Sequence, residues 1–442
     1  MLRARTDAPA RVVGGSGQLI GDTVVTRTTS PRTGGFRPHR DEEHAGFLRS
    51  RVSTHLALQL TFALICCAVM LAGAPRHASE PPSASATAPG ATVPSIEVRV
   101  DDRVTLLSIV ARLAGADEYC DRRSRSRYSD AVDAHFAAFR GHDAVVRFRE
   151  MRARHGVGYD APMSLACHLG PLPALEERID LAAAPERFDA RWKPVETRAF
   201  LTALRAFVRD TKVEEFLASQ RAFERGAVDR LAQAFDGAHL RAWCDGFFGA
   251  RDGAHFEVRV GLLCGPHSYG VGARSAMSGG PREEVTPVIG CWRWDAVQGF
   301  PTWPKGVVEP LIVHELCHSY VNAEVDRAWP VLEAPSGALL AIDEARMRRQ
   351  AYPTPRIVCY ETIVRACVVR FARARAGEGG ERRAKASEVS EGFPWVPAVA
   401  DALGEYERSS SGASAAGTAR DFGAFLPSLA PVLAREAERL AR

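Results

Sequence analysis

The hydrophobic pattern of the chain changes character near residue 255. Before that point, apolar residues recur at helical spacing from residue 102 to about residue 240, as in DRVTLLSIVARLA and VETRAFLTALRAFVRD. This spacing predicts a series of amphipathic helices. One alternating segment, IEVRV at residues 96–100, precedes them and predicts a strand. Residues 96–240 are therefore expected to form a mostly helical N-terminal half.

Short strands and two apolar helices are predicted for residues 241–408. HFEVRVGLLC, the glycine-rich turn GPHSYGVG and EVTPVIGCWRW have the pattern of strands around a turn. They are followed by VVEPLIVHELCHSYVNAEV, where Pro310 stands early in a helix, and by VCYETIVRACVVRFARA at residues 358–374. Residues 409–442 begin with a Ser/Ala/Gly-rich run, which predicts a flexible link before a terminal helix. This order of elements predicts an α+β fold.

An uncharged apolar segment, LALQLTFALICCAVMLAGA, occupies residues 56–74. A membrane-spanning helix needs roughly 20 apolar residues and the apolar core of a signal peptide roughly 7–15, so residues 51–74 are expected to be a signal peptide or a signal-anchor. A Pro/Ala/Ser-rich linker follows at residues 75–95. Residues 1–50 are expected to be a disordered leader, or to be untranslated if the start lies later. Both cases place the folded part outside the cytoplasm, secreted, periplasmic or anchored through residues 56–74.

Composition narrows the class of partner. The 57 basic and 53 acidic residues give a net charge of +4, and the two signs are interspersed along the chain. Because no concentrated basic face results, we expect no nucleic-acid partner. Eight of the cysteines lie outside the apolar segment, an even number that permits disulfides in an exported protein. Without a C-x-x-C pair, their pairing stays open between disulfides and buried thiols.

The motif H-E-x-x-H occurs once, as His314-Glu315-Leu316-Cys317-His318. On a helix the i, i+4 spacing puts both imidazoles on one face, where they can share one Zn²⁺ ion. Glu315 lies beside them, in a position to take a proton from a water molecule and not to bind the metal. The pattern predicts His314 and His318 as metal ligands and Glu315 as a catalytic base.

A catalytic zinc ion needs a third protein ligand and one open position. Glu324 has the spacing of H-E-x-x-H-x-x-G-x-x-H, but Val321 stands where that pattern needs glycine. His267, in the GPHSYG turn, is a second candidate, and it is equally suited to donate a hydrogen bond to a substrate. Glu361 is preferred, because it lies on an apolar helix with Arg365 four residues later to hold its carboxylate.

Several segments resemble an uncharacterised bacterial family of predicted zinc metallopeptidases that carries a domain-of-unknown-function label. They are VTLLSIVARLAGADEYC, GVGYDAPMSLACHL, GPHSYG, HELCHSYVN and YETIVRA, and they span roughly residues 104–371. The resemblance implies a gluzincin-like site with His314, His318 and Glu361 as ligands and Glu315 as base. It also implies a zincin-like half at residues 241–408, with a small sheet packed on the H-E-x-x-H helix. The interval from His318 to Glu361 is longer than in thermolysin-like enzymes, and their N-E-x-x-S-D pattern is missing.

The expected function is zinc-dependent hydrolysis of a peptide or protein substrate outside the cytoplasm. The developing oxyanion needs a donor, for which Tyr269 is preferred over His267 and Tyr360. The strand at residues 255–264 or 284–294 could pair with an extended peptide along an exposed edge, or be an ordinary paired strand, which is the preferred interpretation. Two alternatives stay open: a non-catalytic binding or structural domain that zinc stabilises, and a membrane-tethered interaction protein without metal.

Overall fold

A computed structural model describes residues 95–442, except for residues 181–187, 252, 276–281 and 414–420. None of the helices in these ranges is long and apolar enough to cross a membrane. The predicted leader, the apolar segment at residues 56–74 and all but the last residue of the linker lie outside the described residues. Their assignments therefore stay predictions.

The fold is mostly helical with one small mixed sheet, which confirms the α+β class. The strands are β1 (Glu97–Arg99), β2 (His255–Gly261), β3 (Tyr269–Ser275) and β4 (Arg282–Gly290). The helices of the N-terminal half are α2 (Asp102–Leu113), α3 (Arg127–Phe136), α4 (Asp143–His155), α5 (Ala161–Cys167), α6 (Pro194–Asp210), α7 (Val213–Ala232) and α8 (Gly237–Phe248). The later helices are α9 (Lys305–Ile342), α10 (Glu344–Arg349), α11 (Pro355–Glu391), α12 (Val396–Ala413), α13 (Phe422–Phe425) and α14 (Ala430–Ala441).

The sheet has the strand order β1-β2-β4-β3. β1, β2 and β4 are parallel, and β3 runs antiparallel to β4 with Tyr269 opposite Val288. The strand of the predicted helical half, β1, thus completes the sheet of the second half. Residues 255–264 and 284–294 contain β2 and β4, which each have a neighbouring strand on both sides, so they are ordinary paired strands and offer no exposed edge to a peptide. The edges of this sheet are β1 and β3.

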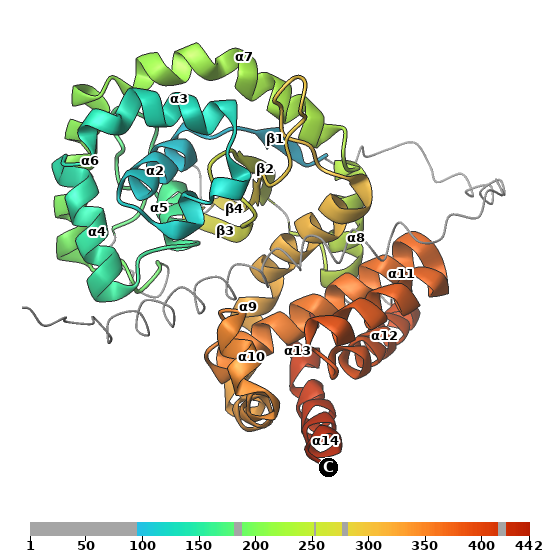
Figure 1. Ribbon diagram of the computed structural model, residues 1–442. Coiled ribbons are helices and arrows are strands. Elements are labelled where there is room, and N and C mark those ends of the chain that lie inside the picture. The colour runs from blue at the N-terminus through green and yellow to red at the C-terminus, as the bar shows by residue number, and fades with distance from the viewer. Residues whose placement is uncertain (1–94, 181–187, 252, 276–281, 414–420) are drawn as a thin grey trace, which may run out of the picture. The chain divides into compact units, whose positions relative to one another are not determined.

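Helix α2 forms the centre of the N-terminal half. Asp101 caps it by accepting a hydrogen bond from the Arg103 backbone N–H, and nine of its twelve residues are buried. Figure 1 shows α3, α4, α6 and α7 curving around α2 and α5. A helix that is apolar on nearly every side can only be stable when other elements cover it on all of them.

The second half contains two long helices where the sequence predicted shorter ones. α9 continues to Ile342 through Pro330 and Pro335. α11 continues to Glu391, but Ala376 and Gly377 leave helical geometry, so α11 consists of two helical segments joined at a sharp kink. The polar Gly/Glu/Arg stretch after residue 374 therefore forms the second segment. Sequence periodicity missed it because charged residues cover most of its surface.

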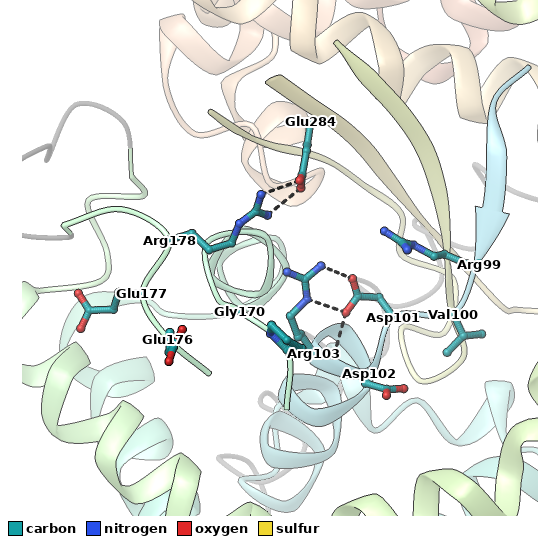
Figure 2. Close-up of a pocket in the computed structure, with 11 residues that line it drawn as sticks. Arg99, Val100, Asp101, Asp102, Arg103, Gly170, Glu176, Glu177, Arg178 and Glu284 are labelled. Atoms are coloured by element: carbon teal, nitrogen blue, oxygen red, sulfur yellow. Dashed lines mark hydrogen bonds and ion pairs between the residues drawn. The ribbon is translucent and has the colours of Figure 1, made fainter. Parts of the chain in front are cut away.

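Buried charged residues form a network beneath the start of α2. Arg259 on β2 is almost fully buried and contacts the Glu257 carboxylate at 2.8 Å and that of Asp101 at 3.2 Å. Arg103 binds Asp101 through two side-chain hydrogen bonds, and Arg178 binds Glu284 in the same way (Figure 2). Buried ions are stable only when they are paired in this manner.

A pocket of about 510 Å³ lies over this network. Its wall includes Arg99, Asp101, Arg103, Arg178 and Glu284 (Figure 2). Each of these charged side chains has an ion-pair partner in the protein. The pocket is therefore a feature of the buried network, and none of the predicted site residues lines it.

Asp101 makes stability depend on pH. Burial alone would raise the pKa of its carboxyl, but hydrogen bonds from Arg103 and the charge of Arg259 lower it to about 2 from 3.8. Because the folded pKa is below the unfolded one, the stabilisation is present above pH 4 and disappears as the pH falls toward 2. Asp101→Asn keeps the helix cap but removes this charge, so we expect it to lower the free energy of unfolding by at least about 2 kcal/mol at pH 7.

Urea unfolding of the wild type and Asp101→Asn between pH 7 and pH 3 tests this expectation. The difference between them should shrink by about 1 kcal/mol by pH 3. A difference that stays constant over this range would contradict it.

Candidate metal centre

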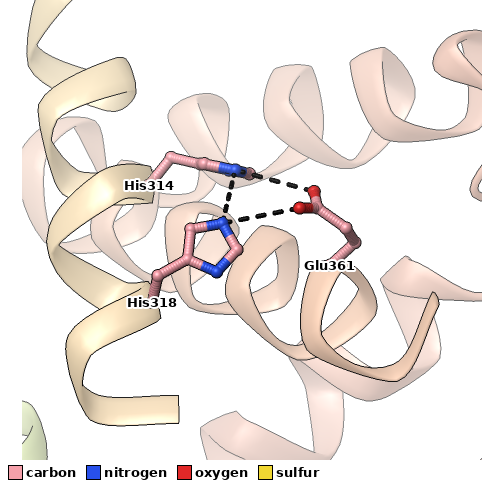
Figure 3. Close-up of side chains that lie close together, drawn as sticks. All are labelled: His314, His318 and Glu361. Atoms are coloured by element: carbon pink, nitrogen blue, oxygen red, sulfur yellow. Dashed lines mark hydrogen bonds and ion pairs between the residues drawn. The ribbon is translucent and has the colours of Figure 1, made fainter. Parts of the chain in front are cut away.

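Helix α9 presents His314 and His318 on the side that faces α11. Its apolar residues Val313, Leu316, Cys317 and Val321 are fully buried, which fixes the rotation of the helix about its axis. The two imidazoles lie one turn apart, with 3.2 Å between their Nε2 atoms (Figure 3). The two imidazoles therefore lie side by side on one face of the helix, as the H-E-x-x-H spacing predicted.

Helix α11 brings Glu361 to the same point. Its Oε1 lies 3.4 Å from His318 Nε2, and its Oε2 lies 3.6 Å from His314 Nε2. Figure 3 shows the carboxylate facing both rings from the neighbouring helix. In the described part of the chain, these three residues form the one group of at least three histidine, cysteine or carboxylate side chains close enough to hold a metal ion.

The spacing of the three donor atoms suits zinc. Two ligand atoms that each lie about 2.0–2.1 Å from a tetrahedral zinc ion are about 3.3–3.4 Å apart. The nearest atoms of each pair of these residues are 3.2, 3.4 and 3.6 Å apart, with Glu361 contributing Oε1 toward His318 and Oε2 toward His314. Glu361 Oε2 is buried without a hydrogen-bond partner among the described residues. Two imidazoles and one carboxylate are also a donor set that zinc prefers. The residues present therefore fit this ion.

Two interactions prepare the imidazoles as ligands. Asn322 Oδ1 lies 3.2 Å from His318 Nδ1, where it can accept the ring proton and so leave the lone pair of Nε2 free for a metal ion. Burial, together with the positive charges that His318 and Arg365 can carry, lowers the pKa of His314 well below its usual value, so its ring is neutral. Sequence reasoning missed Asn322, although its position four residues after His318 was a usable signal.

The side chain of Glu315 lies where α9 packs against the edge strand β3. Its side chain is buried, and the Gly270 backbone N–H donates a hydrogen bond to its carboxylate. Burial and the neighbouring Glu361 carboxylate raise the pKa of Glu315 to about 8. A buried carboxyl group beside a set of metal ligands has the placement that a general base needs.

Comparison with known proteins assigns the chain to a family. Residues 96–412 match the family described as Domain of unknown function (DUF4932). The chain belongs to this family. No curated protein and no solved structure matches it. The match covers all the strands, the three clustered residues and Glu315, and the family description states no activity.

The other candidate ligands of this DUF4932 domain lie outside the cluster. Glu324 lies further along α9, where it makes an ion pair with Arg327. His267 packs its ring edge-to-face on Tyr159, with 5.7 Å between the ring centroids. Of the three candidates for the third ligand, the fold thus brings only Glu361 to the histidine pair.

The candidate oxyanion donors of the DUF4932 domain are not equally placed. Tyr269 neighbours Gly270 on β3, so its side chain points to the opposite face of the sheet from Glu315, where it is buried next to Tyr119. Tyr360 donates its hydroxyl proton to Asp326 at 2.5 Å. The role predicted for Tyr269 stays a prediction, and this orientation lends it no support.

The eight cysteines in the described residues are free thiols, and all except Cys120 are buried. Cys317, within the motif, contacts Cys367 of α11. It fills the core between the two helices that carry the clustered residues.

Gly270 allows β3 to approach α9 closely. A Cβ atom at this position would lie 2.5 Å from the Glu315 carbonyl oxygen and 3.1 Å from His318 Cβ. Because backbone would have to move, we expect Gly270→Ala to lower the free energy of unfolding by about 1–3 kcal/mol and to weaken metal binding.

Gly246→Ala on α8 is the matched control, because a Cβ there meets no atom within 4 Å. This substitution should stabilise the protein by up to about 1 kcal/mol, since alanine has the higher helix propensity. Urea denaturation measures the free energy of unfolding of both variants. Equal values would contradict the proposed steric clash at Gly270.

Proposed function

We propose that this protein is a zinc-dependent metallopeptidase that hydrolyses peptide or protein substrates outside the cytoplasm. The observation that carries the proposal is the convergence of His314, His318 and Glu361 with donor atoms 3.2–3.6 Å apart. Glu315, buried beside them, supports catalysis over a structural role, since a structural zinc site does not need a carboxyl group that is not a ligand. The export is inferred from the apolar segment at residues 56–74.

His314, His318 and Glu361 would hold the ion, which leaves one position of a tetrahedral set open. When bound, zinc supplies a Lewis acid that activates water and offsets the negative charge of the carbonyl oxygen. Beside a bound cation the pKa of Glu315 would fall, so that its carboxylate could accept the proton of the attacking water and pass it to the nitrogen of the leaving amine. The Gly270 N–H and the packing of α9 on β3 hold that carboxylate in place.

The edge strand β3 is where we propose that an extended substrate binds. β3 is an edge strand of the sheet and packs on α9 at Gly270, where an added Cβ atom would meet both Glu315 and His318. A peptide that pairs with the free edge would therefore run past the cluster. In this proposal β3, and not the strand at residues 255–264 or 284–294, pairs with the substrate.

Metal content provides the first test. We expect the purified full-length protein to contain about one zinc ion per chain. His318→Ala should lose it because two ligands cannot hold zinc tightly. His239→Ala, on α8 and outside the cluster, is the control and should retain it. The measurement is inductively coupled plasma mass spectrometry after gel filtration, and zinc retained by His318→Ala would exclude this site.

Glu315→Gln tests the catalytic role. The amide keeps the shape of the side chain but cannot accept the proton, so we expect zinc content to be unchanged and peptide hydrolysis to fall by about 10²–10⁴-fold. Glu324→Gln, on the same helix but outside the cluster, should cut like the wild type. Cleavage of a degenerate peptide library, followed by mass spectrometry, measures both.

A wild type that holds zinc but cleaves no member of the library would contradict the peptidase proposal. That outcome would favour the alternative of a domain that zinc only stabilises.

A further inference from the structure

A buried guanidinium lies directly behind the carboxylate of the cluster. Arg365 is 2% exposed, and its Nε lies 3.5 Å from Glu361 Oε2. The same group donates a hydrogen bond to Glu388 Oε2 at 2.8 Å and stacks on the Phe393 ring, 4.1 Å from its centroid. The i, i+4 pair predicted from the sequence is present, and it is part of a larger arrangement.

Glu388 reaches Arg365 because α11 folds back on itself. The kink at Ala376 and Gly377 separates two helical segments. Ion pairs join a residue before the kink to one about as many positions after it. Arg365 pairs with Glu388 at 2.8 Å, and Arg370 pairs with Glu381 at 2.9 Å. The second segment thus binds the same guanidinium that contacts Glu361, through a different nitrogen atom.

The two oxygens of Glu361 consequently have different surroundings. Oε1 lies nearest to His318 Nε2, at 3.4 Å, whereas Oε2 lies between His314 Nε2 at 3.6 Å and the Arg365 Nε at 3.5 Å. A carboxylate oxygen that is attracted by a buried guanidinium has less charge to offer a metal ion. The fixed cation also prevents the carboxylate from rotating freely.

We propose that Arg365, held by Glu388, is a positioning residue that restricts Glu361 to binding a metal ion through Oε1 alone. One-oxygen binding leaves a coordination position open for water, whereas two-oxygen binding would fill it. Because Arg365 already restricts the Glu361 side chain, less conformational entropy is lost when a metal ion binds. The affinity for the metal is therefore higher. This inference rests on the metal site of the proposed function but not on peptide hydrolysis.

Arg370 offers a matched control on the same helix. It is also buried, and it binds two carboxylates, Glu381 at 2.9 Å and Glu407 at 2.7 Å. Its partners include none of the three clustered residues. Loss of Arg370 therefore removes a comparable buried charge pair without changing the surroundings of Glu361.

The experiment compares Arg365→Met with Arg370→Met in the full-length protein. Zinc affinity is measured by competition with a chromophoric chelator, and coordination by the visible absorption of the Co²⁺-substituted protein, which weakens as the coordination number rises. For Arg365→Met we expect a 10–100-fold rise in the zinc Kd and a weaker Co²⁺ band. Arg370→Met should match the wild type in both. Circular dichroism verifies that each variant is folded.

Glu388→Gln, with Glu381→Gln as its control, decides the matter if Arg365→Met does not fold. It leaves Arg365 in place but weakens its anchor, so a smaller change in the same direction is expected. The inference alone is overturned if the wild type binds zinc and each test variant titrates like its control. If the wild type binds no zinc, both the proposed function and this inference fail.

Discussion

The packing of α9 against α11 is the interaction on which the rest of the site depends. Each helix buries an apolar face in the other, and that contact sets the rotation of both, so His314 and His318 of one helix meet Glu361 of the other. The carboxylate is stable in this buried position because Arg365 lies behind it. A small rotation of either helix would therefore separate the donor atoms and leave a buried charge without a partner.

The sheet is the second element that the site requires. β3 lies against α9 at Gly270, where no side chain separates the strand from the helix, and its backbone orients Glu315. The N-terminal half contributes to this support, because β1 completes the sheet and Asp101 at its end binds Arg259 of the central strand. The long helical stretch between β1 and β2 thus connects two neighbouring strands of one sheet.

Two clusters of buried charge in this protein differ in one physical respect. Around Arg259 the carboxylates of Asp101, Glu257 and Glu284 are each matched by a guanidinium. Around Glu361 two imidazoles and one guanidinium face a single carboxylate, whose Oε2 has no hydrogen-bond partner among the described residues. An incompletely satisfied buried group is costly unless a ligand completes it. This contrast, and not the size of the pocket, distinguishes the candidate site from a structural network.

The sequence alone determined the α+β class, the histidine pair and its neighbouring glutamate, because helical periodicity and i, i+4 spacing are local properties of the chain. It also favoured Glu361, through the Arg365 pair on the same helix. It could not determine the sheet edge, because strand order depends on contacts between β1, β2, β4 and β3 that are distant in sequence. It likewise missed the second helical segment of α11.

Only the tertiary structure decided that Glu324 and His267 lie away from the histidine pair and that Tyr269 faces the opposite side of the sheet. It also decided that Glu388 binds Arg365. Each of these depends on how elements pack, which residue spacing along the chain does not encode.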